Sequence, residues 1–289
     1  MKPPLPSRNK RTLSLRVVAH LSDLHFGHLD RSTLPALKDA IAAAGPDVLV
    51  VSGDLTQRAR DAEFAEAKAF LDSLSCPTIV VPGNHDVPLY NVWARWRTPL
   101  AAYRRHFGED EPVYVDDELA IAGINTARSF TVQGGRINRR QIETACKRFA
   151  GAGLNATRIV VTHHPFDFAG RKGVVGRAHM AVAAFVQGGV DLIASGHGHV
   201  AGAGESVRRY KAAGRSMLLV QAGTATSGRL RGEHNSCNII TIDRPRIAIE
   251  RLTWNEAQGR FVPSHSDHFQ LTPTGWSRTL SADPSHLQQ

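Results

Sequence analysis

Cysteine is scarce in this sequence: its 289 residues contain three, too few and odd in number for a disulfide scaffold. No run of about eighteen apolar residues is present, so no membrane-spanning helix is predicted. The first sixteen residues lack the apolar stretch and the cleavage site of a signal peptide, and we predict a cytoplasmic protein. With 42% hydrophobic and 21% charged residues, the composition excludes a disordered, collagen-like or coiled-coil chain.

Positive charge is in excess, which raises the question of a nucleic-acid partner. The sequence has 35 lysines and arginines and 26 acidic residues, which gives a formal net charge of +9 at pH 7. Residues 1–16 carry five of these positive charges and no acid, so we expect no stable nucleic-acid partner for the rest of the chain. Three short basic clusters remain, and each is interpreted as a solvated face or as a group that helps to hold an anionic substrate: Arg136–Arg140, Arg208–Lys211 and Arg229–Arg231.

Short β-branched segments alternate with amphipathic segments along most of the chain, which favours an α/β fold with a mostly parallel sheet. The predicted strands are 15–21, 47–52, 78–81, 119–125, 158–162 and 191–194. The predicted helices are 34–44, 61–74, 139–150 and 178–187. Four strands then follow without helices, at 217–222, 238–243, 247–254 and 261–271. This change of pattern favours a second sheet packed against the first.

The chain is expected to contain one domain with a tail at each end. We place a basic disordered tail at 1–14, a single domain at 15–271 and a loose polar tail at 272–289. Residues 87–107 are rich in Trp, Arg and Pro and follow a loop of polar side chains. This segment is expected to form a helical cap over a site.

Side chains that bind metals follow five of the predicted strands, at the point where each strand ends. They are Asp23 with His25, Asp54, Asn84 with His85 and Asp86, His163 with His164, and His197 with His199. Ligands of α/β sheets bind beyond the carboxyl ends of the strands, so we expect these side chains to share one edge. A glycine precedes Asp54, Asn84 and His197, which permits a close approach to an ion. Oxygen and nitrogen donors without thiolate suit Mn, Fe, Zn or Ni, and the donors suffice for two ions.

Five motifs in this order resemble the signature set of the calcineurin-like metallophosphoesterases. They are Asp23-Leu24-His25, Gly53-Asp54, Gly83-Asn84-His85-Asp86, His163-His164-Pro165 and Gly196-His197-Gly198-His199. The resemblance runs from about residue 17 to residue 243. It implies a four-layer α/β/β/α sandwich of two mixed sheets, the metallophosphoesterase fold, with two metal ions, Mn or Fe above all, at the sheet edge.

The resemblance also implies a role for each motif residue. One ion would be held by Asp23, His25 and His199. The other ion would be held by Asn84, His163 and His197. Asp54 would bridge both ions. His85 would be the proton donor, Asp86 would orient its imidazole, and His164 would be structural or lie behind the ligands.

The expected reaction is hydrolysis of a phosphodiester. Two ions about 3.5–4 Å apart activate a water between them and neutralise charge on the phosphoryl oxygens. A metal-bridging hydroxide would therefore attack phosphorus, and His85 would protonate the leaving oxygen. His25-Phe26-Gly27, Val81–Asp86 and residues 223–236 resemble the bacterial class III cyclic-nucleotide phosphodiesterases, which implies a small substrate such as 3′,5′-cyclic AMP.

Two other functions stay open. A UDP-2,3-diacylglucosamine pyrophosphatase of lipid A synthesis shares the same motifs, and Trp93 and Trp96 among the arginines of 87–107 would suit a lid with peripheral membrane contact. A non-catalytic binding scaffold on the same fold is the alternative from another class, although such scaffolds typically lose ligands that this chain retains. Metal identity and a homo-oligomeric state are left open by the sequence.

Overall fold

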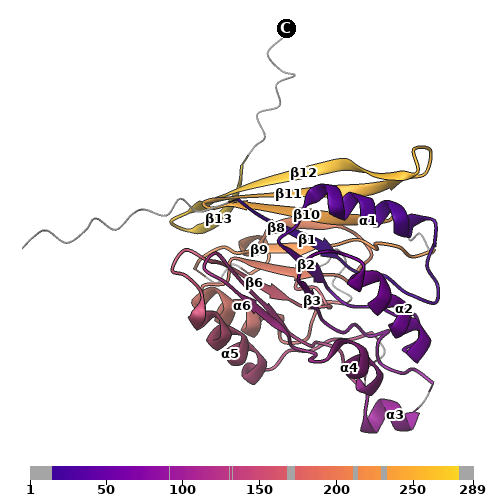
Figure 1. Cartoon of the computed structure of the whole chain (residues 1–289). Helices are drawn as coiled ribbons and strands as arrows, with labels where there is room; N and C mark the ends of the chain where they lie inside the picture. Colours follow the sequence, from indigo (N-terminus) through magenta and orange to yellow (C-terminus); the bar gives the residue numbers. More distant parts are fainter. Residues whose placement is uncertain are drawn as a thin grey trace, which may run out of the picture.

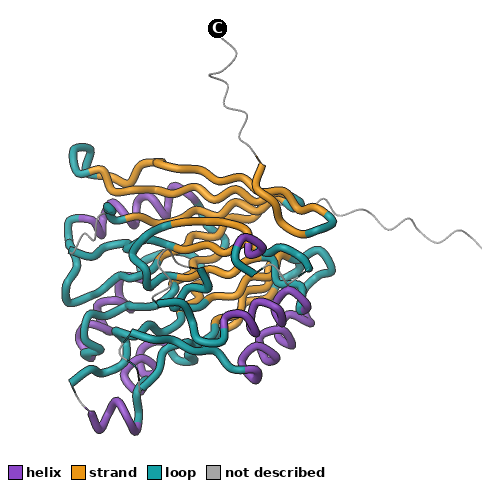
Figure 2. The backbone as a smooth tube through the Cα atoms, turned by 180° about the vertical axis from the view of Figure 1, so that it is seen from behind, coloured by secondary structure: helices purple, strands orange, loops and turns teal. Residues whose placement is uncertain are grey.

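Two packed sheets with helices on their outer faces make up the structure, a computed structural model (Figure 1, and from behind in Figure 2). It describes residues 15–90, 92–129, 131, 133–167, 173–210, 214–228 and 233–279. In sheet order, the seven-stranded sheet contains β13 (Gly275–Thr279), β12 (Arg260–Thr272), β11 (Arg246–Asn255), β10 (Ser236–Asp243), β1 (Arg16–Leu21), β2 (Val48–Val51) and β3 (Thr78–Val80). The six-stranded sheet contains β4 (Val113–Val115), β5 (Leu119–Gly123), β6 (Thr157–Val161), β7 (Leu192–Ser195), β9 (Leu218–Gln221) and β8 (Gly202–Glu205).

Three apolar cores separate four layers. The helices are α1 (Thr33–Ala44), α2 (Asp61–Asp72), α3 (Val92–Arg97), α4 (Ala101–Phe107), α5 (Arg139–Arg148) and α6 (Ala178–Gln187). One core lies between the sheets, one joins α1, α2 and α4 to the seven-stranded sheet, and one joins α5 and α6 to the six-stranded sheet. The predicted α/β/β/α sandwich of two mixed sheets is confirmed.

The inner strands, such as β2, β5, β6 and β7, are mainly apolar because both of their faces are covered. In β1, Val18 belongs to the core between the sheets, whereas Ala19 and Leu21 pack under the helices. This alternation follows the two-residue period of a strand. In the described residues, no helix combines the length and the apolar character needed to cross a membrane.

The predicted grouping of the last four strands is wrong. β9 lies parallel to β7 in the six-stranded sheet, whereas β10 pairs antiparallel with β1 and continues into β11, β12 and β13. Pairing of β10 with β1 gives the open edge of that strand a hydrogen-bonded partner. It also places Ile240 and Ile242 in the core between the sheets.

The predicted loose C-terminal tail begins too early. Residues 275–279 form β13, which pairs with β12, and Trp276 is only 1% exposed. The indole Nε1 of Trp276 donates to Asp191 Oδ1 at 2.9 Å, so a polar-looking segment is fixed by one buried aromatic side chain. The remaining tail residues, 280–289, and the predicted tail at 1–14 lie outside the described residues.

The segment predicted as a cap divides into two parts. α4 belongs to the outer helix layer, because Tyr103 is buried, packs on Phe64 and donates its hydroxyl to Val80 O at 2.9 Å. α3 projects from the body next to α4 (Figure 1). It exposes Trp93 and Trp96 by 72% and 63%.

Replacing Trp276 tests the role of β13. Trp276→Ala removes a fully buried side chain, and we expect it to lower the free energy of unfolding by about 3–5 kcal/mol. Trp276→Phe keeps most of the buried volume but leaves Asp191 without the indole donor, and it should cost about 1–3 kcal/mol. Chemical denaturation measures both values. An alanine variant as stable as the parent would show that β13 is dispensable.

Candidate metal centre

Five strands from both sheets end at one edge of the molecule, where the predicted site residues gather. β1, β2 and β3 run parallel in one sheet, and β6 and β7 do so in the other. Backbone bonds join the loops that follow: Asp23 N–H donates to Gly53 O at 3.0 Å, and Gly196 N–H donates to His163 O at 2.9 Å. A bond from His197 N–H to Asp23 Oδ2, 3.0 Å long, then crosses from one sheet to the other.

One group of donors surrounds Asp23. His25 Nε2 and His199 Nε2 lie 3.7 and 3.5 Å from Asp23 Oδ1, and the two imidazole rings stack with centroids 5.3 Å apart. Thr224 Oγ1 lies 2.6 Å from His199 Nδ1, which leaves Nε2 of that ring for the interior of the site. Donor atoms of Asp23, His25 and His199 all lie within 4.8 Å of one another, close enough to hold one cation.

A second group surrounds His163. Its Nε2 lies 3.0 Å from Asn84 Oδ1, 3.2 Å from His197 Nδ1 and 3.4 Å from Asp54 Oδ2. Its Nδ1 lies 2.8 Å from Ser52 O, a carbonyl that can only accept, so Nδ1 is the protonated nitrogen. In the neutral ring Nε2 therefore carries a lone pair that faces other acceptors. A cation between these atoms would satisfy all of them.

Asp54 connects the two groups. Its side chain is 1% exposed, and its Oδ1 accepts from the backbone N–H of His85 at 2.8 Å. Its Oδ2 lies 3.4 Å from His163 Nε2 in one group and 4.0 Å from His25 Nε2 in the other. This position fits a carboxylate shared by two ions.

Burial makes the site demand positive charge. Asp23 Oδ1 and His25 Nε2 are buried and have no hydrogen-bond partner among the described residues. Burial acts to raise the pKa of Asp23 and of Asp54, but neighbouring imidazoles outweigh it and hold both pKa values below the usual range. Burial likewise acts to lower the pKa of His163, but Asp54 above all raises it to about 9. Orphaned lone pairs and buried carboxylates fit metal cations.

Backbone strain is concentrated at the same residues. Seven described residues other than glycine have φ in the left-handed region, where such residues cost about 1–3 kcal/mol each. Five of the seven are predicted metal ligands: Asp23, His25, Asp54, His197 and His199. Glycine is required nearby, because a Cβ at Gly83 would overlap Asp54 Oδ1 and one at Gly196 would overlap Ser22 Oγ.

The predicted role of Asp86 is wrong in this structure. His85 Nδ1 lies 2.9 Å from Gln57 O, so a backbone carbonyl orients the imidazole. The Asp86 carboxylate instead accepts from the backbone N–H groups of Leu55, Thr56 and Gly83, and from the Thr56 hydroxyl. Burial, followed by the nearby charge of Asp54, raises the pKa of Asp86 to about 6. Asp86 thus supports the loops that carry Asp54 and His85.

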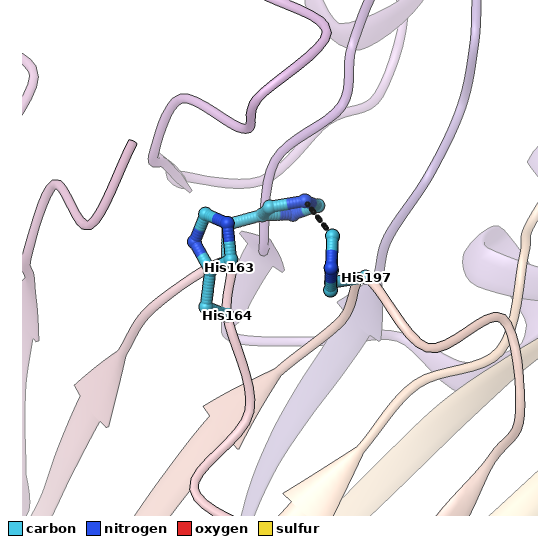
Figure 3. A group of neighbouring side chains, drawn as sticks. All are labelled: His163, His164 and His197. Carbon is cyan, nitrogen blue, oxygen red and sulfur yellow. Dashed lines mark hydrogen bonds between the residues drawn. The ribbon is translucent and has the colours of Figure 1, made fainter. Parts of the chain in front are cut away.

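His164 lies behind the second group. Figure 3 shows the rings of His163 and His197 pointing toward one another, with His164 beside them. The His164 ring centroid is 4.7 Å from that of His197, and its Nδ1 lies 2.8 Å from Thr126 Oγ1. Burial, followed by the neighbouring imidazoles, holds the pKa of His164 well below its usual value, so the ring is neutral.

Sequence reasoning missed the groups that orient the imidazoles. Ser52 O and Gln57 O are backbone carbonyls, so no residue type marks them in the sequence. Thr224 and Thr126 act through side chains, but the sequence gives neither of them a metal-binding spacing. Thr224 falls within the stretch 223–236 that carried the bacterial resemblance.

The fold and the clustered histidines and carboxylates define a metal-dependent phosphoesterase. A sequence profile of the calcineurin-like phosphoesterases matches residues 16–201, more than half of the chain. The chain therefore belongs to the calcineurin-like phosphoesterase family. Proteins of this family use a dinuclear metal site.

Three similar proteins carry related names. A protein of Synechococcus sp. named a probable cyclic nucleotide phosphodiesterase is 26% identical over 200 residues, which is 64% of this chain and 73% of that protein. A glycerophosphodiester phosphodiesterase of Enterobacter lignolyticus is 34% identical over 83 residues, covering 24% of this chain and 29% of that protein. A purple acid phosphatase from yellow lupin (Lupinus luteus) seeds has a TM-score of 0.66 at 13% identity. It matches 88% of this chain, which spans 53% of the lupin chain, and the likeness shows the shared fold.

Metal binding should release a proton and tighten as pH rises. A pKa of about 9 keeps His163 protonated at pH 7 in the metal-free protein, whereas a ligand must be neutral to coordinate. Between pH 6 and 8 the apparent affinity for Mn²⁺ should therefore rise about tenfold per pH unit. Titration calorimetry in buffers of different ionisation enthalpy measures both effects. An affinity that does not change with pH would contradict this placement of His163.

Proposed function

We propose that this protein hydrolyses phosphodiesters with two metal ions held at the shared sheet edge. The supporting observation is that two groups of donor atoms face each other across Asp54, at 3.4 and 4.0 Å. One ion would take the side chains of Asp23, His25 and His199. The other would take Asn84, His163 and His197, with Asp54 shared. Bound there, the ions would supply an activated water and neutralise charge that builds up on the phosphoryl oxygens.

Groups behind the ligands orient the imidazole rings toward the ions. Ser52 O keeps the proton of His163 on Nδ1, so Nε2 points inward as a donor. In the first group, the Thr224 hydroxyl lies 2.6 Å from His199 Nδ1 and orients that ring. Such outer contacts set the ring orientation and raise the basicity of the ligands.

His85 is proposed as the proton donor to the leaving oxygen. Its ring meets the His25 ring edge-on, with centroids 4.9 Å apart, and its donor atom lies within 4.8 Å of donor atoms of His25 and Asp54. Since Nδ1 donates to Gln57 O, the proton that moves would be on Nε2 of a doubly protonated ring. A positioned acid of this kind lowers the barrier most when the leaving group is poor.

A cyclic nucleotide such as 3′,5′-cyclic AMP is the proposed substrate class, and the cytoplasm is the proposed compartment. The name of the Synechococcus relative supports the substrate class, as does the resemblance of His25-Phe26-Gly27 and Val81–Asp86 to the bacterial class III enzymes. The Enterobacter relative supports the broader reaction, because its name also describes a phosphodiester.

One observation favours a second candidate, hydrolysis of UDP-2,3-diacylglucosamine. Trp93 and Trp96 on α3 are exposed by 72% and 63%, and Leu89 and Tyr90 directly before α3 are exposed by 43% and 73%. Exposed aromatic and aliphatic side chains of this kind suit contact with acyl chains at a membrane surface.

Replacing His85 separates proton donation from metal binding. His85→Ala should lower kcat on 3′,5′-cyclic AMP by about 10²–10⁴-fold, and it should keep the metal content measured by mass spectrometry. The loss should be much smaller on bis(p-nitrophenyl) phosphate, whose leaving group needs no proton. Equal losses on both substrates would rule out the assigned role.

The matched variant at the shared position is Asp54→Asn. It keeps the size of the side chain but removes the buried negative charge that both groups face. We expect this variant to lose bound metal and activity together. If it retains both metals with full occupancy, Asp54 is not shared by the two ions.

A side-by-side rate assay decides between the two substrates. Manganese-loaded protein is given 3′,5′-cyclic AMP or UDP-2,3-diacylglucosamine in detergent. Under the leading proposal kcat/KM is higher for the cyclic nucleotide, and Trp93→Ala changes it little because α3 projects from the body. A preference for the lipid that disappears in Trp93→Ala would replace the leading proposal with the second candidate.

A further inference from the structure

Three arginines without a role in the proposed reaction lie on segments that neighbour the metal centre. Arg128 and Arg136 lie on the segment that follows β5, at the sheet edge where the metal-binding side chains gather, and Arg177 immediately precedes α6. Arg136 belongs to a basic cluster that the sequence singled out as a solvated face or a holder of an anionic substrate.

Backbone hydrogen bonds join the segments that carry these arginines, residues 126–128, 135–136 and 176–177. Arg136 N–H donates to Thr126 O at 3.1 Å, and Gly176 N–H donates to Gly135 O at 2.9 Å. Arg136 and Gly176 also form an isolated β-bridge. The backbone directly before Arg177 is therefore held in place. Arg177 itself has a φ of 70°, in the left-handed region that residues other than glycine rarely adopt.

The positive charge of this cluster is uncompensated. Within the described part of the chain, no carboxylate forms a salt bridge with Arg128, Arg136 or Arg177. Partial burial, then the charges of Arg136 and Arg177, lower the pKa of Arg128. The first turn of α6 has no acidic residue and no side-chain cap, so its N–H groups add positive potential next to Arg177.

A cavity lies beside two of the arginines, and a short series of contacts leads from the backbone between them to the metal centre. Arg128 and Arg136 line a cavity of about 280 Å³ together with Asn138. Gly135 packs directly against the His164 ring, where a Cβ would overlap the imidazole. The His164 ring centroid is 4.7 Å from that of His197. The His164 ring thus separates the backbone at Gly135, next to Arg136, from the second group of metal donors.

We propose that Arg128, Arg136 and Arg177 form a subsite for a second phosphate of the substrate, beside the phosphoester that is cleaved. The inference rests on the proposed function, because the subsite extends the same site. It shifts the preferred substrate from 3′,5′-cyclic AMP, which has a single phosphate, to nucleotides that carry two. Arginine is suited to this task, since its planar group binds phosphate oxygens in pairs. Nucleotides with a second phosphate should then be preferred over those with one.

Binding of two small nucleotides tests the subsite without catalysis. The probes are adenosine 5′-monophosphate and adenosine 3′,5′-bisphosphate, titrated calorimetrically into manganese-loaded protein. The bisphosphate should bind at least tenfold more tightly to the parent protein, and Arg128→Gln/Arg136→Gln should abolish that advantage. The control is Arg246→Gln, which removes the same charge at the opposite edge of the sheet, where β10 turns into β11, and should leave the ratio unchanged.

Rates supply the second measurement. The 5′-phosphorylated dinucleotide pApA should show a higher kcat/KM than ApA, with the ratio reduced in the double variant. Arg177→Gln, an exposed position, replaces the double variant if circular dichroism shows that the latter does not fold. Equal affinity for the two nucleotides in the parent protein, or an equal loss in Arg246→Gln, would overturn the subsite. Hydrolysis of bis(p-nitrophenyl) phosphate would still support the proposed reaction in that event.

Discussion

Two carboxylates buried without a permanent positive charge are the constraint on which this site depends. Asp23 is fully buried and Asp54 is 1% exposed. Asp54 faces Nε2 of His163, a ring whose Nδ1 donates its proton to Ser52 O. Both carboxylates also face His25 Nε2, which has no hydrogen-bond partner among the described residues. In a buried site such a set of acceptors is unfavourable unless a cation joins it. The high pKa of His163, about 9, shows the same demand, because a proton there substitutes for part of the missing charge.

The rest of the fold serves to keep these groups in place. Parallel strands from two sheets deliver the ligands to one edge, and the bond from His197 N–H to Asp23 Oδ2 connects the sheets at that point. Left-handed backbone at five ligands costs free energy that the packed cores on both sides of each sheet must offset. Strain of this kind is expected where geometry is fixed for binding rather than for stability.

Residue type and position after a strand were enough to predict the site's location. Asp23, Asp54 and His163 each follow a β-branched run, and such runs are visible in a single sequence. Strand pairing was harder, because β10 joins β1 across more than 200 residues and no local pattern records that choice. The orienting role given to Asp86 failed for a related reason: Gln57 supplies a backbone carbonyl, which every residue has. The role of Trp276 was missed because its neighbours in the sequence, residues 272–275 and 277–279, are all polar or small, although its own ring is buried.

Anomalous diffraction from crystals of the manganese-loaded protein tests the central claim most directly. Two peaks are predicted, one on each side of Asp54, with Asp23, His25 and His199 around one and Asn84, His163 and His197 around the other. His164 should remain outside both coordination spheres. The donor atoms of His163, His164 and His197 also lie within 4.8 Å of one another. An ion bound by these three histidines together, or a single peak, would contradict the account.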